Sequence, residues 1–588
     1  MKNHRNIRDG ASRRSITVTK SGRAKPVSGT PNSDSGNPAL SRRSVIRAGA
    51  VAAAFMLAGC TAEAADDSPS AAPTATGPAG PQGRFVFAAA APPATLDPAL
   101  AADTESYRIT RQVLEGLVGV DALTSAPTPL LAKSWTKSED RRTYTFDLRR
   151  DVTFHDGEPF NAEAVRRNFE RWYTLPESVR SDSLMYRSVF RGFSDSPKTA
   201  IYRECVVVDE YTVRVELNEP LDSFIPALAA PAFAMSSPKA LTDADALTQE
   251  RNGRKVSAYG VSPVGTGPFR FVSWNDDTVE LAAYPGYWGE AGQIGTVVFR
   301  TIASPEGRLR ALKKGEVDGY DLVTVNDVGD LARNGLQIQQ RDPYSILYLG
   351  INSSFPGLDD VLMRRAVAHA IDKPAVLDGL FLNGTKPANQ FLPEKLGLTS
   401  DSVTSYGYDV DKARELLKEA GYDGRELPFY YPRRVTRSYL PTPEKIYARL
   451  SSQLTAAGFN IRPVPVDWSQ GYLEKVQGKE DRAFHLLGLA GSYEAGDNFL
   501  GTLFGRYTDE FSFNDPEVFS GIEKARTLTE GQEQTDAYRG ITDRISERVP
   551  AVPLAFPISA LALSPRVGSY PTSPVLHEVF NRVKLTDS

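Results

Sequence analysis

The chain has 588 residues, of which 41% are hydrophobic and 10% aromatic, with 68 Lys and Arg against 72 Asp and Glu. This ordinary globular composition excludes a collagen-like or mostly disordered chain, and the length allows two or three large lobes with sizeable cores. The net charge of −4 gives no indication of nucleic-acid binding, and two cysteines cannot form a disulfide framework of any size.

The first 59 residues differ from the rest in charge and are typical of an export signal. They hold eleven Lys and Arg and two acidic residues, which leaves 57 basic and 70 acidic residues and a net charge of −13 beyond them. Arg42 and Arg43 precede an uncharged run, residues 48–57, which is too short to cross about 30 Å of hydrocarbon as a helix. We interpret residues 1–59 as a signal peptide with a twin-arginine pair, with Sec export as the alternative.

A lipid-attachment motif ends this run. Residues 57–60 read Leu-Ala-Gly-Cys and resemble the lipobox of bacterial lipoproteins, in which the thiol receives diacylglycerol and the chain is cut just before the cysteine. Cys60 is therefore the predicted lipidation site, and the alternative is an N-terminal membrane helix with an incidental cysteine. Residues 60–83 have no large apolar side chain and predict a disordered tether. We expect an exported protein held by a lipid on the outer face of the cytoplasmic membrane.

Regular elements are predicted next along the chain. Residues 143–149 and 211–217 alternate between apolar and polar side chains, which predicts two half-buried strands. Asn161 can cap a helix that runs to residue 173, and Asp360 can cap one that runs to residue 371.

Between residues 409 and 500 helices and strands alternate. Asp409 is expected to cap a helix that Gly421 ends, and Thr442 with Pro443 is expected to open another that Gly458 ends. A strand over 461–468, a short helix over 472–476 and an apolar run over 484–489 follow. The alternation predicts α/β architecture.

Motifs of covalent chemistry are absent from the sequence. It contains no Gly-x-Ser-x-Gly elbow, Walker loop, His-Glu-x-x-His or Cys-x-x-Cys. His155, Asp156 and Gly157 lie between a strand and a helix, where Asp-Gly is typical of a turn. Cys205 is followed by three valines and is expected to be a small core residue. We therefore predict no enzyme, no catalytic residues, no cofactor and no metal site.

Several short blocks together point to one family. They occupy residues 95–98, 131–135, 144–163, 263–269, 285–289, 312–318 and 364–373. In their number and order they resemble the extracellular solute-binding proteins of family 5, the dipeptide- and oligopeptide-binding lipoproteins of ABC importers. The resemblance runs from about Phe85 to the end of the chain.

The resemblance implies an α/β fold of the two-lobed periplasmic-binding-protein type, hinged and class II-like, with an additional domain inserted in the first lobe. By analogy the first lobe comprises residues 84–118, 223–302 and 550–588, the inserted domain 119–222 and the second lobe 303–549. In this family the solute lies in the cleft between the lobes, which close over it by a hinge motion.

One segment of the implied second lobe suggests an anchor for an anion. Residues 435–443 resemble the segment whose arginine pairs with the ligand carboxylate in dipeptide binders, which implies that Arg437, with Tyr439 beside it, contacts the solute. A guanidinium can bind a carboxylate through two parallel hydrogen bonds. The alternative is a surface arginine that precedes a helix cap.

A second segment lacks an expected acid. Residues 488–500 resemble a segment that contains a Trp and an Asp, of which the Asp holds the α-ammonium of the peptide, but here these two positions are Leu489 and Ser492. Burying an ammonium without its carboxylate costs roughly 3–5 kcal/mol. Either Glu494, Asp497 or Glu105 replaces the missing acid, or the ligand has no free α-ammonium. Tyr493 completes the candidate residues of this segment.

The expected function is solute capture for an importer. The resemblance implies a monomer that binds a peptide or peptide-like small molecule and delivers it to an ABC permease with its ATPase subunits, with a lipid anchor as its contact with the membrane and without nucleic acid. The alternative within the same fold is an oligosaccharide or other non-peptide solute. A secreted hydrolase and a surface sensor or adhesin are the rivals of another class.

Overall fold

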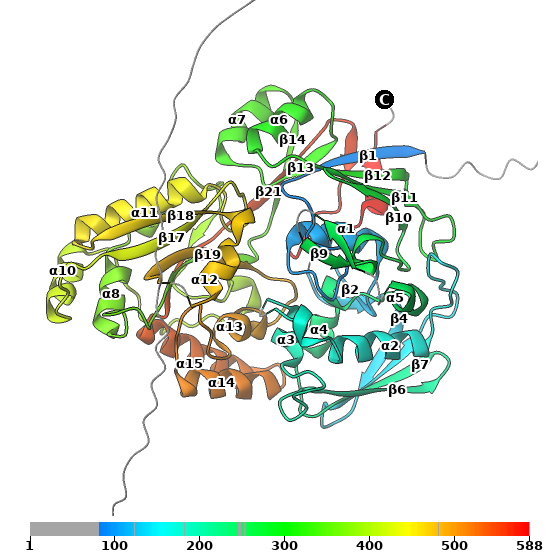
Figure 1. Ribbon diagram of the computed structural model, residues 1–588, viewed down its shortest axis with the longest axis horizontal. Helices are drawn as coiled ribbons and strands as arrows, with labels where there is room; N and C mark the ends of the chain where they lie inside the picture. Colours follow the sequence, from blue (N-terminus) through cyan, green and yellow to red (C-terminus); the bar gives the residue numbers. More distant parts are fainter. Residues whose placement is uncertain are drawn as a thin grey trace, which may run out of the picture. The chain divides into compact units, whose positions relative to one another are not determined.

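The computed structural model describes residues 82–122, 124–181, 183–244, 248–251, 254–479 and 481–586 (Figure 1). The predicted signal peptide, Cys60 and nearly all of the predicted tether lie outside these residues. Gly83 already begins the first strand, β1 (Gly83–Ala89), because its amide donates to the carbonyl of Gln293 at 3.0 Å. The folded body therefore starts one residue earlier than the predicted tether range allows.

In the described part of the chain, seven strands form the first sheet. Across the sheet the order is β10 (Phe269–Asn275), β11 (Thr278–Ala283), β12 (Ile294–Thr301), β1, β13 (Gly319–Asp321), β21 (Ser559–Leu563) and β14 (Gln337–Arg341). β1 is parallel to both β12 and β13, and its last five residues are buried, as is usual for parallel strands covered on both faces. The associated helices are α1 (Thr104–Val113), α6 (Pro305–Lys313) and α7 (Val325–Arg333).

Six described strands form the second sheet. Their order is β16 (Lys386–Pro387), β20 (Ala551–Phe556), β15 (Ser345–Ile351), β19 (Phe484–Ala490), β17 (Leu427–Arg433) and β18 (Ile461–Asp467). The helices of this part are α8 (Val361–His369), α9 (Lys373–Leu377), α10 (Val410–Glu419), α11 (Pro443–Ala457), α12 (Tyr472–Gln477), α13 (Gly496–Phe504), α14 (Pro516–Thr527) and α15 (Gln532–Arg548). β15 lies inside the sheet, and all seven of its residues are buried.

A third sheet has its own aromatic core. Its strands are β4 (Ala132–Lys137), β5 (Thr143–Leu148), β7 (Thr212–Leu217) and β6 (Tyr202–Asp209), with α2 (Ala162–Tyr173) and α3 (Met185–Phe190). All of these elements fall within the range predicted for the inserted domain. Cys205 is buried in this core, as predicted, and burial raises the pKa of its thiol.

Shorter elements connect the sheets. They are β2 (Val118–Val120), β3 (Pro127–Pro129), α4 (Phe224–Leu228), α5 (Pro238–Ala244), β8 (Thr248–Arg251), β9 (Arg254–Ser257), β22 (Val567–Ser569) and β23 (Lys584–Leu585). No described helix has the length and apolar character that crossing a membrane requires.

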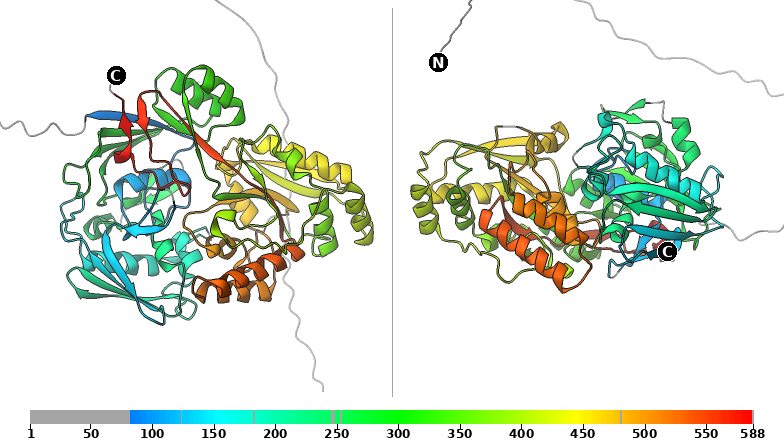
Figure 2. Two further views of the ribbon diagram at one scale, coloured as in Figure 1. Left: turned by 180° about the vertical axis from the view of Figure 1, so that it is seen from behind. Right: turned by 90° about the horizontal axis from the view of Figure 1, so that it is seen from below.

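The sheets divide the chain differently from the predicted lobe boundaries. β13 and β14, predicted in the second lobe, pair with β21 in the first sheet, whereas β20, predicted in the first lobe, pairs with β15 in the second. In the described residues the chain therefore passes between these two sheets at 342–344 and at 557–558. Figure 2 shows the segment with β20 and β21 running from one sheet into the other.

Capping residues in the sequence predicted where several helices begin. Asn161, Asp360 and Asp409 each accept a backbone hydrogen bond as the N-cap of α2, α8 and α10. α8 ends at His369, two residues before the predicted end, because Asp372 caps the separate helix α9. Pro443 opens α11 as predicted, but the side chain of Thr442 makes no capping hydrogen bond.

Candidate functional site

The candidate site is built where three parallel strands end. β17 runs parallel to both β18 and β19, so the segments that follow these strands, 434–442, 468–471 and 491–495, meet along one edge of the second sheet. In open α/β sheets, ligands bind outside the carboxyl ends of parallel strands. This edge carries most of the residues that the sequence singled out.

Arg437 lies in a tight turn after β17. The amides of Arg437 and Leu440 each donate to the carbonyl oxygen of the other residue at 3.0 Å. The guanidinium carbon lies 4.4 Å from the centre of the Trp468 ring, within the range of a cation–π contact. Among the described residues, no carboxylate forms an ion pair with Arg437, so its charge is positioned by an aromatic face and is available to an anion.

The Arg437 turn borders a groove that both sheets line. The groove contains residues 322–325 after β13, residues 380–382, residues 436–438 with Pro441, and residues 558–560 at the second connection between the sheets. Leu322 has φ of +65°, a left-handed conformation that bulky residues rarely adopt, and its amide donates to Asp321 Oδ1 at 2.7 Å. A molecule in this groove would contact both sheets and the connection between them.

Tyr439 lies against the strand that leads to Ser492. A Cβ atom at Gly488 would lie only 2.4 Å from Cδ2 of Tyr439, so the ring can approach β19 because residue 488 is glycine. Burial raises the pKa of Tyr439 to about 12, which keeps the hydroxyl protonated as a hydrogen-bond donor at neutral pH. Leu489, next on β19, is partly buried and packs on the apolar core of the second lobe.

Ser492 and Tyr493 lie in the loop between β19 and α13. The amide of Ser492 donates to Asn498 Oδ1 at 2.8 Å. Tyr493 is 3% exposed and packs in the hydrophobic core around the third sheet, and its carbonyl accepts a hydrogen bond from the Tyr344 hydroxyl at 2.8 Å. The structure thus brings Arg437 and Tyr439 to the sheet edge, whereas the Tyr493 side chain is buried in the hydrophobic core around the third sheet.

Two of the three candidate acids already have cationic partners. Asp497 is buried, accepts a hydrogen bond from Ser223 Oγ at 3.0 Å and lies 3.2 Å from Nε of Arg526. Glu105 is buried in the first turn of α1 and lies 3.2 Å from Nε of Arg108. Neither carboxylate is free to balance a ligand ammonium without losing an existing partner.

Glu494 differs from these two acids. It is partly exposed, and among the described residues it forms no ion pair. Burial raises the pKa of its carboxyl group, and the charge of Lys395 opposes this shift. Of the three acids weighed from the sequence, Glu494 is the one whose charge is uncommitted.

The His155-Asp156-Gly157 segment forms a turn, as predicted. Gly157 has φ of +85°, and its amide donates to the Phe154 carbonyl at 2.9 Å. The Nε2 atom of His155 lies 2.9 Å from the Gly267 carbonyl, and burial lowers the pKa of the ring to about 4. His155 therefore holds two loops together as a neutral imidazole. In the part of the chain that the structure describes, no group of three His, Cys, Asp or Glu residues could hold a metal ion.

Two residues at the site were missed by the sequence analysis. Trp468 directly follows β18, and Leu322 directly follows β13. Their position immediately after a strand was the available signal, because the residue after a parallel strand is at the edge where ligands bind.

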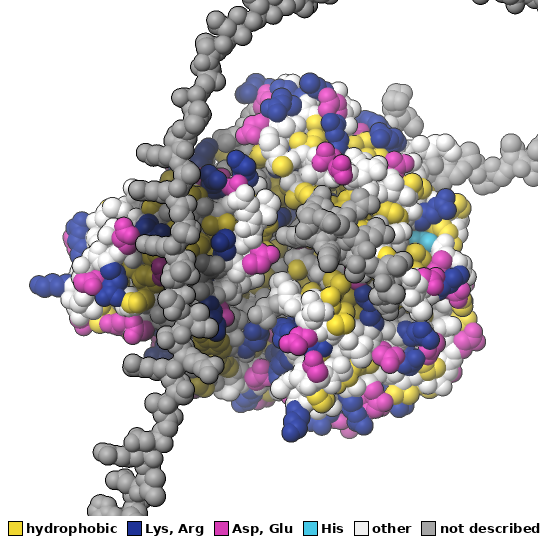
Figure 3. Space-filling model, viewed as in Figure 1, with side chains coloured by type: hydrophobic (Ala, Val, Ile, Leu, Met, Phe, Trp, Pro, Cys, Tyr) yellow, Lys and Arg dark blue, Asp and Glu magenta, His cyan; other side chains and the backbone are white. Residues whose placement is uncertain are grey.

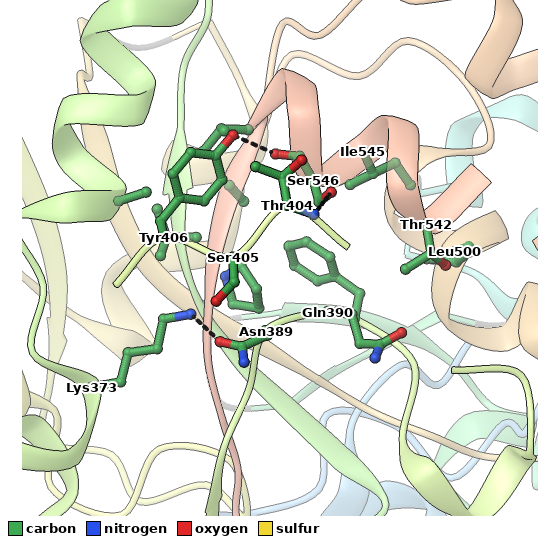
Figure 4. Close-up of a pocket in the computed structure, with 16 residues that line it drawn as sticks. Lys373, Asn389, Gln390, Thr404, Ser405, Tyr406, Leu500, Thr542, Ile545 and Ser546 are labelled. Carbon is green, nitrogen blue, oxygen red and sulfur yellow. Dashed lines mark hydrogen bonds between the residues drawn. The ribbon is translucent and has the colours of Figure 1, made fainter. Parts of the chain in front are cut away.

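A separate pocket lies inside the second lobe, around Lys373 (Figure 4). Lys373 is 9% exposed, and its Nζ atom donates to the Ala388 carbonyl at 2.7 Å and to Asn389 Oδ1 at 3.1 Å. Both acceptors are neutral, and burial lowers the pKa of the amine to about 8. None of the candidate site residues lines this pocket, so it is distinct from the groove.

Lys373 makes stability depend on pH. Between pH 8 and the ordinary lysine value of 10.5, the unfolded chain binds a proton here that the folded chain does not, so folding becomes more favourable as the pH rises through this window. The unfolding free energy of the wild type relative to Lys373→Met is expected to rise by up to about 3 kcal/mol. Urea denaturation of both proteins at several pH values measures the difference, and a difference that stays constant across the window would contradict the assignment.

Comparison with known proteins agrees with this geometry. Residues 126–511 match the model of the bacterial extracellular solute-binding proteins, family 5 Middle. Heme-binding protein A of Haemophilus influenzae is 27% identical over 518 residues, which cover 85% of this chain and 92% of that protein. Glutathione-binding protein GsiB of Salmonella typhimurium is 30% identical over 476 residues, which cover 78% of this chain and 86% of that protein.

A solved structure supports the same relationship. The ABC transporter-associated periplasmic binding protein DppA from Helicobacter pylori, in complex with the peptide STSA, matches with a TM-score of 0.76 and 25% identity over 86% of this chain and 98% of that chain. The predicted two-lobed α/β fold is thereby confirmed. The family match over residues 126–511, the similar proteins and the groove between the two sheets lead to one conclusion. The chain belongs to family 5 of the bacterial extracellular solute-binding proteins, the solute-binding components of ABC importers.

Proposed function

We propose that this protein captures a peptide-like solute with at least one anionic group for an ABC importer. The observation that carries the proposal is the guanidinium of Arg437, which lies on Trp468 beside the groove and forms no ion pair with a described residue. A planar guanidinium held by an aromatic face is well suited to a carboxylate. The protein does no covalent chemistry in this role, because its work is binding, closure and release to a permease.

The proposed ligand class follows from the relatives and the residues at the sheet edge. The relatives bear names for heme and glutathione, and the DppA structure contains a peptide. Arg437 and Tyr439 offer a charge and a hydroxyl donor, which suit a peptide-like molecule. A non-peptide solute is the second candidate, favoured by Leu489 and Ser492 in place of the family's Trp and Asp.

We further propose that the solute has no free α-ammonium. Ser492 is neutral, Asp497 is paired with Arg526, and Glu105 is paired with Arg108. Recruiting either acid for a ligand would leave a buried arginine without its partner, which is costly. Glu494 is the described acid that would take over if the ligand did carry an ammonium.

The same proposal includes attachment and closure. Cys60 would carry the lipid, and the tether from residue 60 would let a monomeric body reach its permease and ATPase subunits on the outer face of the cytoplasmic membrane. Binding in the groove would favour the closed arrangement through contacts with both sheets, with the connections at 342–344 and 557–558 as the hinge.

Thermal unfolding against a solute panel tests the proposal. The panel contains free dipeptides, N-acetylated dipeptides, peptide amides and oligosaccharides. A ligand at 100 times its dissociation constant stabilises the protein by about 2.7 kcal/mol. We expect stabilisation by N-acetylated peptides with a free carboxylate, and loss of that stabilisation in Arg437→Ala.

A neighbouring arginine provides the matched control. The Arg434 side chain is 79% exposed in the same loop and lies 3.3 Å from Asp467, so Arg434→Ala removes a charge without touching the groove. It should keep the stabilisation that Arg437→Ala loses. Stabilisation by free dipeptides that Glu494→Gln abolishes would show that an ammonium is recognised, and stabilisation that survives in Arg437→Ala would overturn the role of Arg437.

A further inference from the structure

A second pocket in the described residues lies in the first lobe, away from the groove. Its wall is formed by Arg111 at the end of α1, Glu115, residues 229–231, Tyr287 and residues 577–582 near the C-terminus. It encloses about 620 Å³, including space open to solvent. No residue of this wall belongs to the groove around Arg437.

Three basic side chains line one wall of this pocket. Arg111 makes no hydrogen bond or ion pair with a described residue, and its Nε atom is fully buried without a partner. His577 and Arg582 line the same wall. Burial lowers the pKa of His577 well below its ordinary value, and Arg111 and Arg582 lower it further. Burial also lowers the pKa of Arg111 to about 10. His577 is therefore a neutral imidazole near pH 7, and the positive charge of this wall comes from Arg111 and Arg582.

The neighbouring acids compensate these charges only in part: the charge of Glu578 opposes the lowering of the Arg111 pKa, but its carboxylate has other partners. The Glu578 carboxylate is bound by Arg341 at 2.6 and 2.9 Å and by the Tyr570 hydroxyl at 2.7 Å. Glu115 accepts hydrogen bonds from Trp288, Thr266 and Tyr287 at 2.8 to 2.9 Å, and burial raises its pKa to about 7, so near neutral pH it is partly uncharged. The pocket is thus positively charged on one side.

The opposite side of the pocket is apolar. Leu114, Val118, Leu130, Pro231 and Val579 contribute to it. The buried Nε–H group of Arg111 has no acceptor, which costs free energy, and a bound anion that accepted its hydrogen bond would recover that cost. An anion that also has a hydrocarbon body would cover the apolar wall.

We propose that this pocket binds a small organic carboxylate, with its carboxylate group on Arg111 and its hydrocarbon part against Leu114 and Val579. The site is separate from the groove, so the carboxylate is a second ligand and the proposal does not depend on the identity of the imported solute. Inorganic phosphate shares the charge but not the apolar body, and it serves as the comparison.

Calorimetric titration of the full-length protein with sodium butyrate tests the proposal. For six non-hydrogen atoms, a dissociation constant of about 1 mM or below is expected. Arg111→Gln should weaken butyrate binding by at least about tenfold. Arg333→Gln, a change at a 74% exposed arginine on α7, and Arg437→Ala should leave the affinity unchanged.

Each other outcome overturns the proposal. Butyrate that binds equally well to Arg111→Gln, or loses its affinity in Arg437→Ala, places the carboxylate elsewhere. Phosphate binding without butyrate binding excludes the organic carboxylate. No heat and no saturation-transfer NMR signal with butyrate at about ten times the expected dissociation constant rejects the site. Arg111→Lys, which keeps the charge, should retain part of the affinity, and equal melting temperatures show that the variants fold.

Discussion

Replacing Arg341 with methionine is expected to lower the free energy of unfolding by about 3–5 kcal/mol. Arg341 lies at the end of β14 with 1% of its side chain exposed. Its guanidinium binds Glu578 at 2.6 and 2.9 Å and Asp321 Oδ1 at 2.7 Å. Both carboxylates are almost fully buried, so the substitution leaves them with Arg108 as their remaining cation.

The pH dependence of this effect follows from the same contacts. Although burial opposes it, Arg341 and Arg108 hold the pKa of Asp321 below its ordinary value. In the wild type this stabilisation is present above the ordinary aspartate pKa near 3.8 and disappears only when the pH falls through the lower folded value. In Arg341→Met, protonation of Asp321 relieves the cost of burying its carboxylate without this partner, so the loss of stability should be smaller at about pH 4 than at pH 7.

Chemical denaturation monitored by circular dichroism measures both quantities. Arg333→Met is the matched control, because its guanidinium is 74% exposed and should contribute less than about 1 kcal/mol. A loss below about 1 kcal/mol for Arg341→Met, or a deficit that grows toward acid pH, would show that the network does not stabilise the first sheet as described.

Elements with a local signal could be predicted from the sequence. The alternation in 143–149 and 211–217 became β5 and β7, with every second residue buried, because the period of two is a property of a strand that has one buried face. The caps Asn161, Asp360 and Asp409 could be predicted for the same reason, since a cap is satisfied by backbone amides two or three residues away.

Sheet membership could not be predicted in this way. β13 has three residues and β14 is largely polar, so neither has a pattern that marks it as part of a sheet. Both pair with β21, more than 200 residues later in the chain. The predicted lobe boundaries do not follow these pairings, because the pairing is set by long-range hydrogen bonds that no local window of sequence contains.

The same distinction between local and long-range information applies to the candidate site. Arg437 and Tyr439 were identified through a resemblance of sequence segments. The structure adds two contacts that a sequence segment does not contain: the Trp468 ring packs on the Arg437 guanidinium, and Gly488 allows the Tyr439 ring to approach β19. Asp497 was a reasonable candidate for a ligand acid, but its partners Ser223 and Arg526 come from other elements. A carboxylate's availability depends on such partners, and they become visible only in three dimensions.

The distribution of charge over the surface can also be described only from the three-dimensional structure. On the face seen in Figure 3, Lys and Arg side chains alternate with Asp and Glu over the visible elements, with no large patch of one sign. The excess negative charge computed for the chain beyond residue 59 is therefore not gathered on that face. An ion pair such as Arg166 with Glu163 and Glu170 on α2 shows how these charges neutralise one another locally.

Asp497→Ala is the second substitution with a large expected effect, again about 3–5 kcal/mol of unfolding free energy. Arg526, 5% exposed at its side chain, would lose its anionic partner, and its other contacts, the carbonyl oxygens of Ser188 at 3.2 Å and Val189 at 2.6 Å, are neutral. Asp497 lies in α13 and Arg526 in α14, whereas Val189 lies in α3 beside the third sheet and Ser223 directly precedes α4. The pair therefore joins α13 and α14 to the elements around the third sheet.

Asp497→Asn separates this structural role from ligand recognition. The amide keeps an oxygen for the Ser223 hydroxyl, and because burial raises the pKa of the Asp497 carboxyl, a neutral side chain should be tolerated better than its removal, at a cost of about 1–2 kcal/mol. A double-mutant cycle with Arg526→Met, measured by urea denaturation, should give a coupling of at least about 1 kcal/mol. If Asp497 held a ligand ammonium instead, Asp497→Asn would abolish binding of free peptides while Arg526→Met left the unfolding free energy nearly unchanged.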